Sequence, residues 1–225
     1  MDREALLLTL ELASATTLIL LCVAVPLAWW VTSGQGFART LVQALVALPI
    51  VLPPTVLGFY LLVGLGPTTS LGRALIHLLG HPLAFSFSGL LVGSVIYSLP
   101  FAVQPLISGF RAVDRELLEA ASLLGAGPLS RLARITLPLS RPAVLSAAVL
   151  VFTHTVGEFG VVLMLGGNIP GSTRTLSISL YNLVEDGRYG DANRTALLLV
   201  GFALTGLVLL YTLAAHQPTV RSPLA

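Results

Sequence analysis

The sequence predicts an all-helical membrane protein, a polytopic bundle of spanning helices in one domain over residues 1–225. Hydrophobic residues make up 55% of the positions and charged residues only 10%, whereas a soluble domain carries about a quarter charged residues. The mean hydropathy is +0.91. The long apolar segments lack the period-two alternation of a transmembrane β-barrel. We therefore expect the chain to lie in a lipid bilayer as a helical bundle.

Five apolar segments are long enough to cross the hydrocarbon core, which takes about 20 residues of helix. They are residues 12–31, 41–66, 83–110, 142–167 and 195–215. Residues 6–10 can extend the first helix. The acidic start and the long apolar run differ from a signal peptide, so we expect a retained helix there. Five spans are predicted, and a sixth is left open.

Arginines predict the orientation, because all 12 basic residues are arginines and the chain has no lysine. Five lie in the loop of residues 111–141, and Arg39 and Arg221 fall on the same side of a five-span topology. Cytoplasmic loops carry the excess of positive charge. We therefore expect this loop and the C-terminus in the cytoplasm, and the N-terminus outside.

The loop of residues 111–141 is predicted to hold a short amphipathic helix, a turn and a second short helix. Asp114 suits an N-cap, Gly125 and Gly127 suit a left-handed helix end, and Pro128 suits the next first turn. Apolar residues repeat on one face of the first helix: Leu117, Leu118, Ala121 and Leu124. From periodicity alone, an ordinary interfacial helix is the better explanation.

Residue identities in this loop are more specific than its periodicity. Glu119-Ala120-Ala121, then Gly125, then Ile135, Leu137 and Pro138, resemble the EAA motif of ABC-importer permeases at every marked position. In that family the motif forms the coupling helix, which docks in a cleft of the cytoplasmic ATPase. The resemblance implies a permease of the type I importer kind. It also implies the following ATPase-coupling residues: Glu119, Ala120, Ala121, Gly125 and Gly127.

The absence of lysine agrees with this resemblance. A phosphate-binding loop needs a lysine that reaches the terminal phosphates of ATP, and this chain has none. We therefore expect that the chain is not itself the ATPase and has no catalytic residue. No cofactor or metal is expected in this chain, and ATP and Mg²⁺ would be bound by the partner ATPase.

Two further regions resemble oxyanion permeases. Residues 48–58 look like the second-helix signature of the molybdate and sulfate group. Gly-Glu-Phe-Gly at 157–160 and Gly-Asn-Ile-Pro-Gly-Ser-Thr-Arg-Thr at 167–175 are similar to the molybdate branch. The resemblance covers most of the chain and implies a permease for molybdate or tungstate, which the sequence does not separate. A sulfate or thiosulfate permease is the alternative.

The bends expected in the spans are candidates for the pathway or gate. Prolines in the second and third spans free backbone carbonyls, which a pathway can use, although packing kinks are equally common. An acid inside a membrane is a functional candidate by default. The candidates are Pro53, Pro54, Thr55, Gly157, Glu158 and Gly160. Because the spans hold no Arg or Lys, we expect weak anion contacts from hydroxyls, N–H groups and helix N-termini.

The loop of residues 168–194 is expected outside the membrane, where a substrate-binding protein could dock. Its docking candidates are Arg174, Arg188 and Arg194. An ordinary solvated loop explains these charges equally well. Residues 175–184 are too short to span and place apolar residues on one face, which predicts a short interfacial helix.

Two other classes of function fit less well. His154 and Glu158 are spaced i, i+4, but no third ligand accompanies them, so a metalloenzyme is disfavoured. A secondary transporter usually shows inverted repeats and more intramembrane charge.

The resemblance implies an alternating-access importer in the cell (inner) membrane. Five spans are few for a closed pathway, and the family's subunits pair around one, so we expect a homodimer. The other expected partners are two cytoplasmic ABC ATPase subunits, an extracytoplasmic molybdate- or tungstate-binding protein and the lipid bilayer. No nucleic acid is expected.

Overall fold

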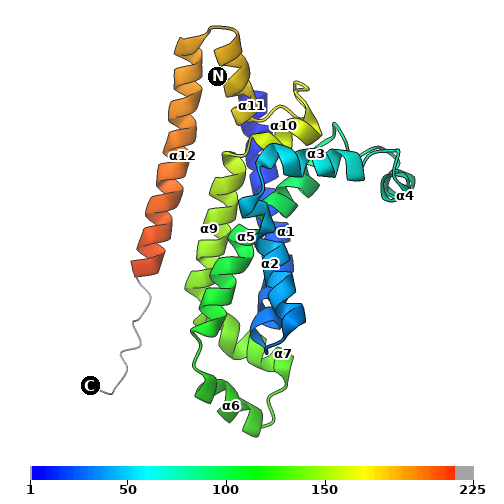
Figure 1. The fold of residues 1–225 in the computed structure, drawn as a ribbon. Helices are drawn as coiled ribbons and strands as arrows, with labels where there is room; N and C mark the ends of the chain where they lie inside the picture. The colour runs from blue at the N-terminus through cyan, green and yellow to red at the C-terminus, as the bar shows by residue number, and fades with distance from the viewer. Residues whose placement is uncertain (1, 216–225) are drawn as a thin grey trace.

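The structure, a computed structural model, describes residues 2–215, and Arg221 lies outside this range. Every regular element of residues 2–215 is helical, which confirms the predicted fold class. The molecule is elongated, with the N-terminus and α11 at one end and α6 at the other (Figure 1). The predicted outer and cytoplasmic loops thus lie at opposite ends. Which end faces the cytoplasm stays a prediction.

The helices follow one another along the chain with short connections. In order they are α1 (Arg3–Thr32), α2 (Phe37–Val51), α3 (Pro54–Gly64), α4 (Ser70–Leu79), α5 (Phe87–Arg111), α6 (Arg115–Leu123), α7 (Pro128–Arg131), a π-helical turn η1 (Leu132–Thr136), α8 (Leu137–Leu139), α9 (Arg141–Val156), α10 (Gly160–Gly166), α11 (Leu176–Glu185) and α12 (Tyr189–Ala215). Three helices, α1, α5 and α12, are long and apolar enough to cross a membrane. Two bent helix pairs raise the number of crossings to five if each counts as one, and the described part of the chain offers no sixth.

The first and third predicted spans are continuous helices. α1 begins at residue 3 because the Asp2 side chain accepts a hydrogen bond from the Ala5 N–H at 3.0 Å, so residues 6–10 do extend it. α5 begins after Ser86, whose hydroxyl caps the helix by accepting from the Gly89 N–H at 3.2 Å. Pro100 and Pro105 lie within α5 and do not end it.

The second predicted span, residues 41–66, is wrong as a single helix. α2 and α3 meet at an angle of 113°. Pro53 has no N–H to continue the helical ladder, and a residue before proline is pushed out of the α region. Leu52 (ψ 137°) and Pro53 (ψ 134°) are accordingly extended. α3 therefore runs sideways from the bundle, and α4 projects beyond it (Figure 1).

The fourth predicted span, residues 142–167, is also not one helix. α9 ends at Val156, and α10 begins at Gly160 after an irregular stretch. At its other end α9 is joined, through a 75° bend, to the helical segment of residues 128–139. Hydropathy does not reveal the break, because residues 157–159 contain only one charged residue, Glu158, beside Gly and Phe.

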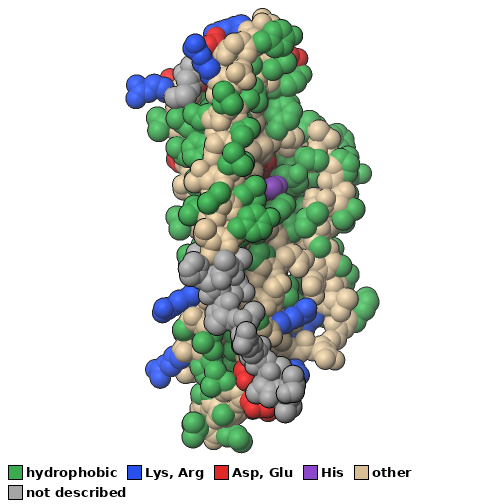
Figure 2. Space-filling view, turned by 90° about the vertical axis from the view of Figure 1, so that its left-hand side faces the viewer, with side chains coloured by type: hydrophobic (Ala, Val, Ile, Leu, Met, Phe, Trp, Pro, Cys, Tyr) green, Lys and Arg blue, Asp and Glu red, His purple; other side chains and the backbone are tan. Residues whose placement is uncertain are grey.

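The core lies where α1, α5 and α9 meet. Its fully buried residues include Leu20, Ala24, Val103, Leu106 and Ala147, and their small and branched side chains allow the helices to approach closely. α12 lies along the outside against α9 (Figure 1), with only 6% of its apolar window buried. On that face, apolar side chains cover the middle stretch and arginines lie toward the two ends (Figure 2). This distribution suits a protein surrounded by lipid.

Candidate functional site

The predicted cytoplasmic loop forms the expected helix and turn. The Asp114 carboxylate accepts the Glu116 N–H at 2.9 Å and caps α6. Gly125 has φ +84°, a left-handed conformation that favours glycine. Gly127 does not share it: its φ of −65° and ψ of 165° are extended, because Pro128 follows. The structure thus corrects Gly127 from a helix end to the residue before α7.

α6 forms the tip of the molecule (Figure 1), and none of its residues is buried. Leu123 and Leu124 are 90% and 88% exposed. The expected docking residues Glu119, Ala120 and Gly125 are exposed as well. Leu118 and Ala121 are partly buried, but Leu123 and Leu124 extend into the surroundings, as expected for a surface that a second protein covers.

A helical segment leads from this tip to the bundle. Residues 128–139 form a nearly continuous helical segment in which Leu132 and Thr136 are buried. At the bend into α9, the Ser140 hydroxyl donates to the Gly109 carbonyl of α5 at 3.1 Å. Gly109 lies so close to α9 that a Cβ there would sit 2.3 Å from the Ala143 Cβ. The bend between residues 128–139 and α9 is therefore packed closely against α5.

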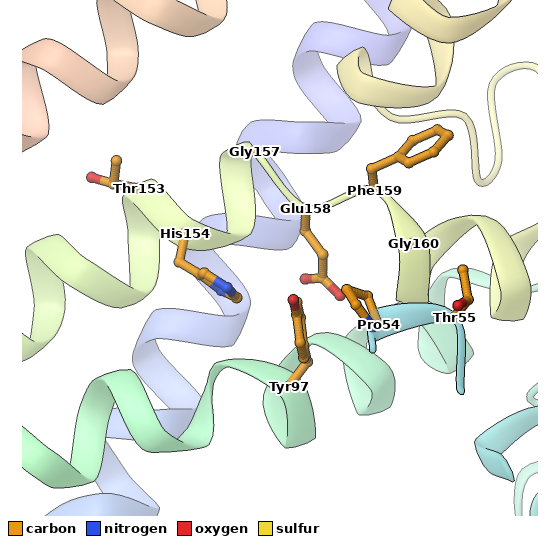
Figure 3. Close-up of a pocket in the computed structure, with 9 residues that line it drawn as sticks. All are labelled: Pro54, Thr55, Tyr97, Thr153, His154, Gly157, Glu158, Phe159 and Gly160. Atoms are coloured by element: carbon orange, nitrogen blue, oxygen red, sulfur yellow. The ribbon is translucent and has the colours of Figure 1, made fainter. Parts of the chain in front are cut away.

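A cavity of about 550 Å³ lies where the two broken helices meet (Figure 3). Its lining residues are Pro54, Thr55, Tyr97, Thr153, His154, Gly157, Glu158, Phe159 and Gly160. Five of the six predicted pathway candidates are among them. The sixth, Pro53, precedes α3 as its N-cap. The structure thus brings together two segments about a hundred positions apart, and their role as a gate stays a prediction.

α3 and α10 touch through glycines. A Cβ on Gly160 would lie 2.7 Å from the Pro54 Cβ, and one on Gly58 would lie 2.7 Å from the Met164 Cβ. Real Cβ atoms do not approach that closely, since carbon atoms pack best about 3.5–4.0 Å apart. Only glycine therefore allows the two half-helices to pack at this distance.

Glu158 is the acid of this cavity. Its side chain is 4% exposed and points between Tyr97 and Pro54 (Figure 3). Neither carboxylate oxygen has a hydrogen-bond partner in the described part of the chain. The buried Ser94 hydroxyl of α5 lies close enough to this carboxyl to interact with it, although the geometry is not that of an ordinary hydrogen bond. Because buried polar groups are costly without a partner, Ser94 is the partner that the chain offers to Glu158.

His154 makes its side-chain contacts with α5, although Glu158 is only four residues away in the chain. Its Nδ1 atom lies 2.9 Å from the Ser98 hydroxyl of α5. Its ring stacks on Phe101, with centroids 4.0 Å apart. Residues 2–215 contain no group of three or more metal-ligating side chains. His154 is therefore a packed part of the cavity wall.

Sequence reasoning missed part of this wall. Tyr97, Thr153 and Phe159 were not predicted to line a pathway. One signal was available, because Ser94, Tyr97 and Ser98 follow helical spacing on α5 and form a polar stripe in an apolar span.

The predicted outer loop holds a short helix, but that helix is not free at a membrane surface. The first turn of α11, residues 176–179, is buried against the bundle, and Val184 of the predicted apolar face is 45% exposed. The Leu176 N–H donates to the Thr9 hydroxyl of α1 at 2.9 Å. α11 is thus anchored to α1 by its first turn.

The three predicted docking arginines have different surroundings. Arg188 forms an ion pair with Asp191 at 2.6 Å, and Arg194 lies 3.9 Å from the same carboxylate. Arg174 instead donates from Nε to the Asn168 side-chain oxygen at 2.7 Å.

Comparison with known proteins relates this architecture to one family. Residues 17–221 match the family model described as binding-protein-dependent transport system inner membrane component. The chain is 49% identical, over 94% of its length and 93% of the relative, to the molybdenum transport system permease protein ModB of Azotobacter vinelandii. It is 33% identical to the ModB protein of Escherichia coli K12, over 92% of this chain and 91% of that one.

Solved structures show a similar fold. The chain aligns with a bacterial ABC transporter involved in the import of the acidic polysaccharide alginate, with a TM-score of 0.72 and 20% identity, covering 97% of this chain and 79% of the other. The same transporter type in complex with an alginate-bound periplasmic protein gives a TM-score of 0.73 at 19% identity, over 96% and 77% of the two chains. At this identity the likeness concerns the fold alone.

Proposed function

The chain belongs to the family of binding-protein-dependent transport system inner membrane components, and from this premise we propose that it imports molybdate, or tungstate, as the permease subunit of an ATP-driven ABC importer. The observation that supports molybdate as the substrate is the 49% identity to a molybdenum transport permease over 94% of the chain. The motif at residues 167–175 lies within that matched length and agrees with it.

The cavity suits a pathway for a dianion that must not be held tightly. Its lining contains hydroxyl groups, the N-terminus of α3, His154 and one acid, Glu158, and no Arg or Lys. A fixed cation at membrane depth costs about 2.5 kcal/mol or more and would also trap a dianion. Hydroxyls and the positive end of a helix offer weaker contacts that form and break easily.

The structure suggests how ATPase movement reaches this cavity. α9 has 16 residues and is therefore about 24 Å long. It begins at the bend beside the coupling loop and ends at the break that holds Gly157 and Glu158. A tilt imposed on α6 is carried through residues 128–139 into α9 and, because α9 packs closely on α5, turns the chain and its cavity as one unit. This supports alternating access driven from α6.

The proposal includes partners that this chain needs. Two ABC ATPase subunits would bind ATP and Mg²⁺ and dock on α6 through Glu119, Ala120, Ala121 and Gly125. A second copy of the chain would complete the pathway, and a binding protein would deliver the anion at the α11 end. In this arrangement the N-terminus lies outside the inner membrane and α6 lies in the cytoplasm.

Uptake of labelled molybdate tests the function. Proteoliposomes would contain this chain with its ATPase subunits, with loaded binding protein on one side and ATP on the other. We expect ATP-dependent uptake that excess tungstate abolishes and excess sulfate leaves nearly unchanged. Competition by sulfate as strong as that by tungstate would move the assignment to a sulfate permease. Uptake driven by an ion gradient without the ATPase would refute the importer class.

A further inference from the structure

Arg174 is held in place by a pair of asparagine side chains. Asn168 donates to the Asn182 oxygen at 2.9 Å, and Asn182 donates back to the Asn168 oxygen at 3.0 Å. The same Asn168 oxygen accepts the Arg174 Nε–H at 2.7 Å. Both lone pairs of this oxygen are thus used, and one edge of the guanidinium is fixed.

The backbone around Arg174 is also fixed. The buried Thr173 hydroxyl donates to the Gly166 carbonyl at 2.6 Å and accepts the Ile169 N–H at 3.2 Å. The Ile169 carbonyl in turn accepts the Arg174 N–H at 3.1 Å. Thr173 is therefore tied to α10, and Leu176, two residues after Arg174, is tied to Thr9 of α1, so the arginine is presented from a fixed backbone.

The outer edge of the guanidinium, Nη1 and Nη2, has no acidic partner in the described part of the chain. Glu4 reaches the Gly171 turn of the same loop but forms no ion pair with Arg174. Arg188 and Arg194 differ because they share the Asp191 carboxylate. Of the three docking candidates, Arg174 alone is both oriented and electrically unpaired within residues 2–215.

Such a group is suited to a carboxylate on another protein. The two Nη atoms form a planar fork that binds a carboxylate through two parallel hydrogen bonds. Long side chains usually lose about 0.5–1.5 kcal/mol of rotamer entropy on binding, and Asn168 has already removed much of that freedom. A free oxyanion would meet one exposed cation screened by salt, whereas a docking protein adds contacts around it.

We propose that Arg174, oriented by Asn168, is the residue of this permease that receives a carboxylate of the substrate-binding protein. This rests on the proposed function and deepens it by selecting one docking residue and its partner chemistry. Asn168 acts through Arg174 as a positioning residue.

The assay is ATP hydrolysis by the reconstituted complex, titrated with molybdate-loaded binding protein. Charge-assisted hydrogen bonds are strong enough to expect Arg174→Ala to raise the half-maximal concentration about tenfold. Arg174→Glu should raise it further, with the plateau rate kept. Arg188→Ala is the matched comparison, and its shift should stay below about twofold because its charge is already paired.

Asn168→Asp separates docking from folding. The new carboxylate can still accept from Asn182 and would pair with Arg174 inside the chain, so we expect a loss close to that of Arg174→Ala although the arginine remains. A binding-protein variant with one surface acid changed to Lys should restore the affinity of Arg174→Glu. A half-maximal concentration unchanged in Arg174→Ala, or a lowered plateau alone, would overturn the inference. If loaded binding protein fails to stimulate the wild-type complex, the proposed function itself fails.

Discussion

Gly160→Ala tests whether the contact between the two helix breaks is required for transport. The added Cβ would lie 2.7 Å from the Pro54 Cβ and 3.5 Å from the Thr55 nitrogen. A normal carbon contact is about 3.7 Å, so α3 and α10 must separate by about 1 Å. The Pro54 ring cannot rotate away, because its Cβ is part of the ring. Overpacking of this kind costs about 1–3 kcal/mol.

The functional effect should exceed the effect on stability. A displacement of about 1 Å in a pre-organised site can cost a factor of about 100, so we expect ATP-driven molybdate uptake to fall at least tenfold. The thermal midpoint of the assembled complex should fall by a few degrees. Both quantities are measured on the same preparation, by labelled uptake in proteoliposomes and by thermal unfolding.

Gly64→Ala is the matched control, since Gly64 ends α3, the helix that Gly160 contacts through Pro54, and a Cβ there meets nothing within 4 Å. Its helical propensity predicts equal or slightly higher stability and normal uptake. If Gly160→Ala transports as well as Gly64→Ala, the contact between the breaks plays no part in transport.

Three further substitutions address other parts of the molecule. Gly125→Asp should abolish ATP-driven uptake, because it brings a charge into the docking surface and strains a turn whose φ is +84°. The protein should still insert, because a Cβ there meets no atom within 4 Å and Asp adopts the left-handed conformation more readily than most residues; normal uptake would refute the coupling role. Glu158→Gln keeps a hydrogen-bonding group of the same shape, so its uptake should stay within about threefold of wild type, whereas Glu158→Leu should lose at least tenfold; equal loss in both would show that the carboxylate charge is required instead. Thr9→Val leaves the Leu176 N–H without its acceptor, which costs about 1–3 kcal/mol and should lower the thermal midpoint. The control, Thr205→Val on the exposed helix α12, should leave the thermal midpoint unchanged.

The sequence predicted the helices that depend on interactions between residues close together in the chain. α1, α5 and α12 follow from apolar length, and α6 follows from Asp114, Gly125 and Pro128, which act on neighbouring residues. Pro53 and Pro54 also indicated correctly where the second span is interrupted. The 113° angle could not be predicted, because it depends on α3 packing against α10, a contact between residues far apart in the chain.

The cavity was predicted in part for the same reason. Motif resemblance selected Thr55 and Glu158 separately, but nothing local indicated that α3 and α10 would meet. Tyr97 belongs to a polar stripe that the sequence shows, but Thr153 looks like an ordinary polar residue in a span, and only the fold brings the two to one cavity. The predicted left-handed conformation of Gly127 was wrong, because the proline that follows it favours an extended backbone at this position.

The close glycine contacts also limit where the pathway can open. Gly160 against Pro54, Gly58 against Met164 and Gly93 against Leu165 leave no space for α3, α5 and α10 to slide past one another. Packed interfaces of this kind move as rigid bodies.

In the proposed homodimer, the pathway would therefore open between the two copies of the chain and not within one. Spin labels at the exposed Tyr60 of α3 and at Ile169 beyond α10 test this, after exchange of the exposed Cys22 for Ser. Their separation within one chain, in complexes where only one copy is labelled, should stay constant between the ATP-free and ATP-bound states. The separation of Tyr60 labels in the two copies should change, because each copy turns as a unit about its partner. A change within one chain as large as that between copies would place the moving boundary at the helix breaks instead.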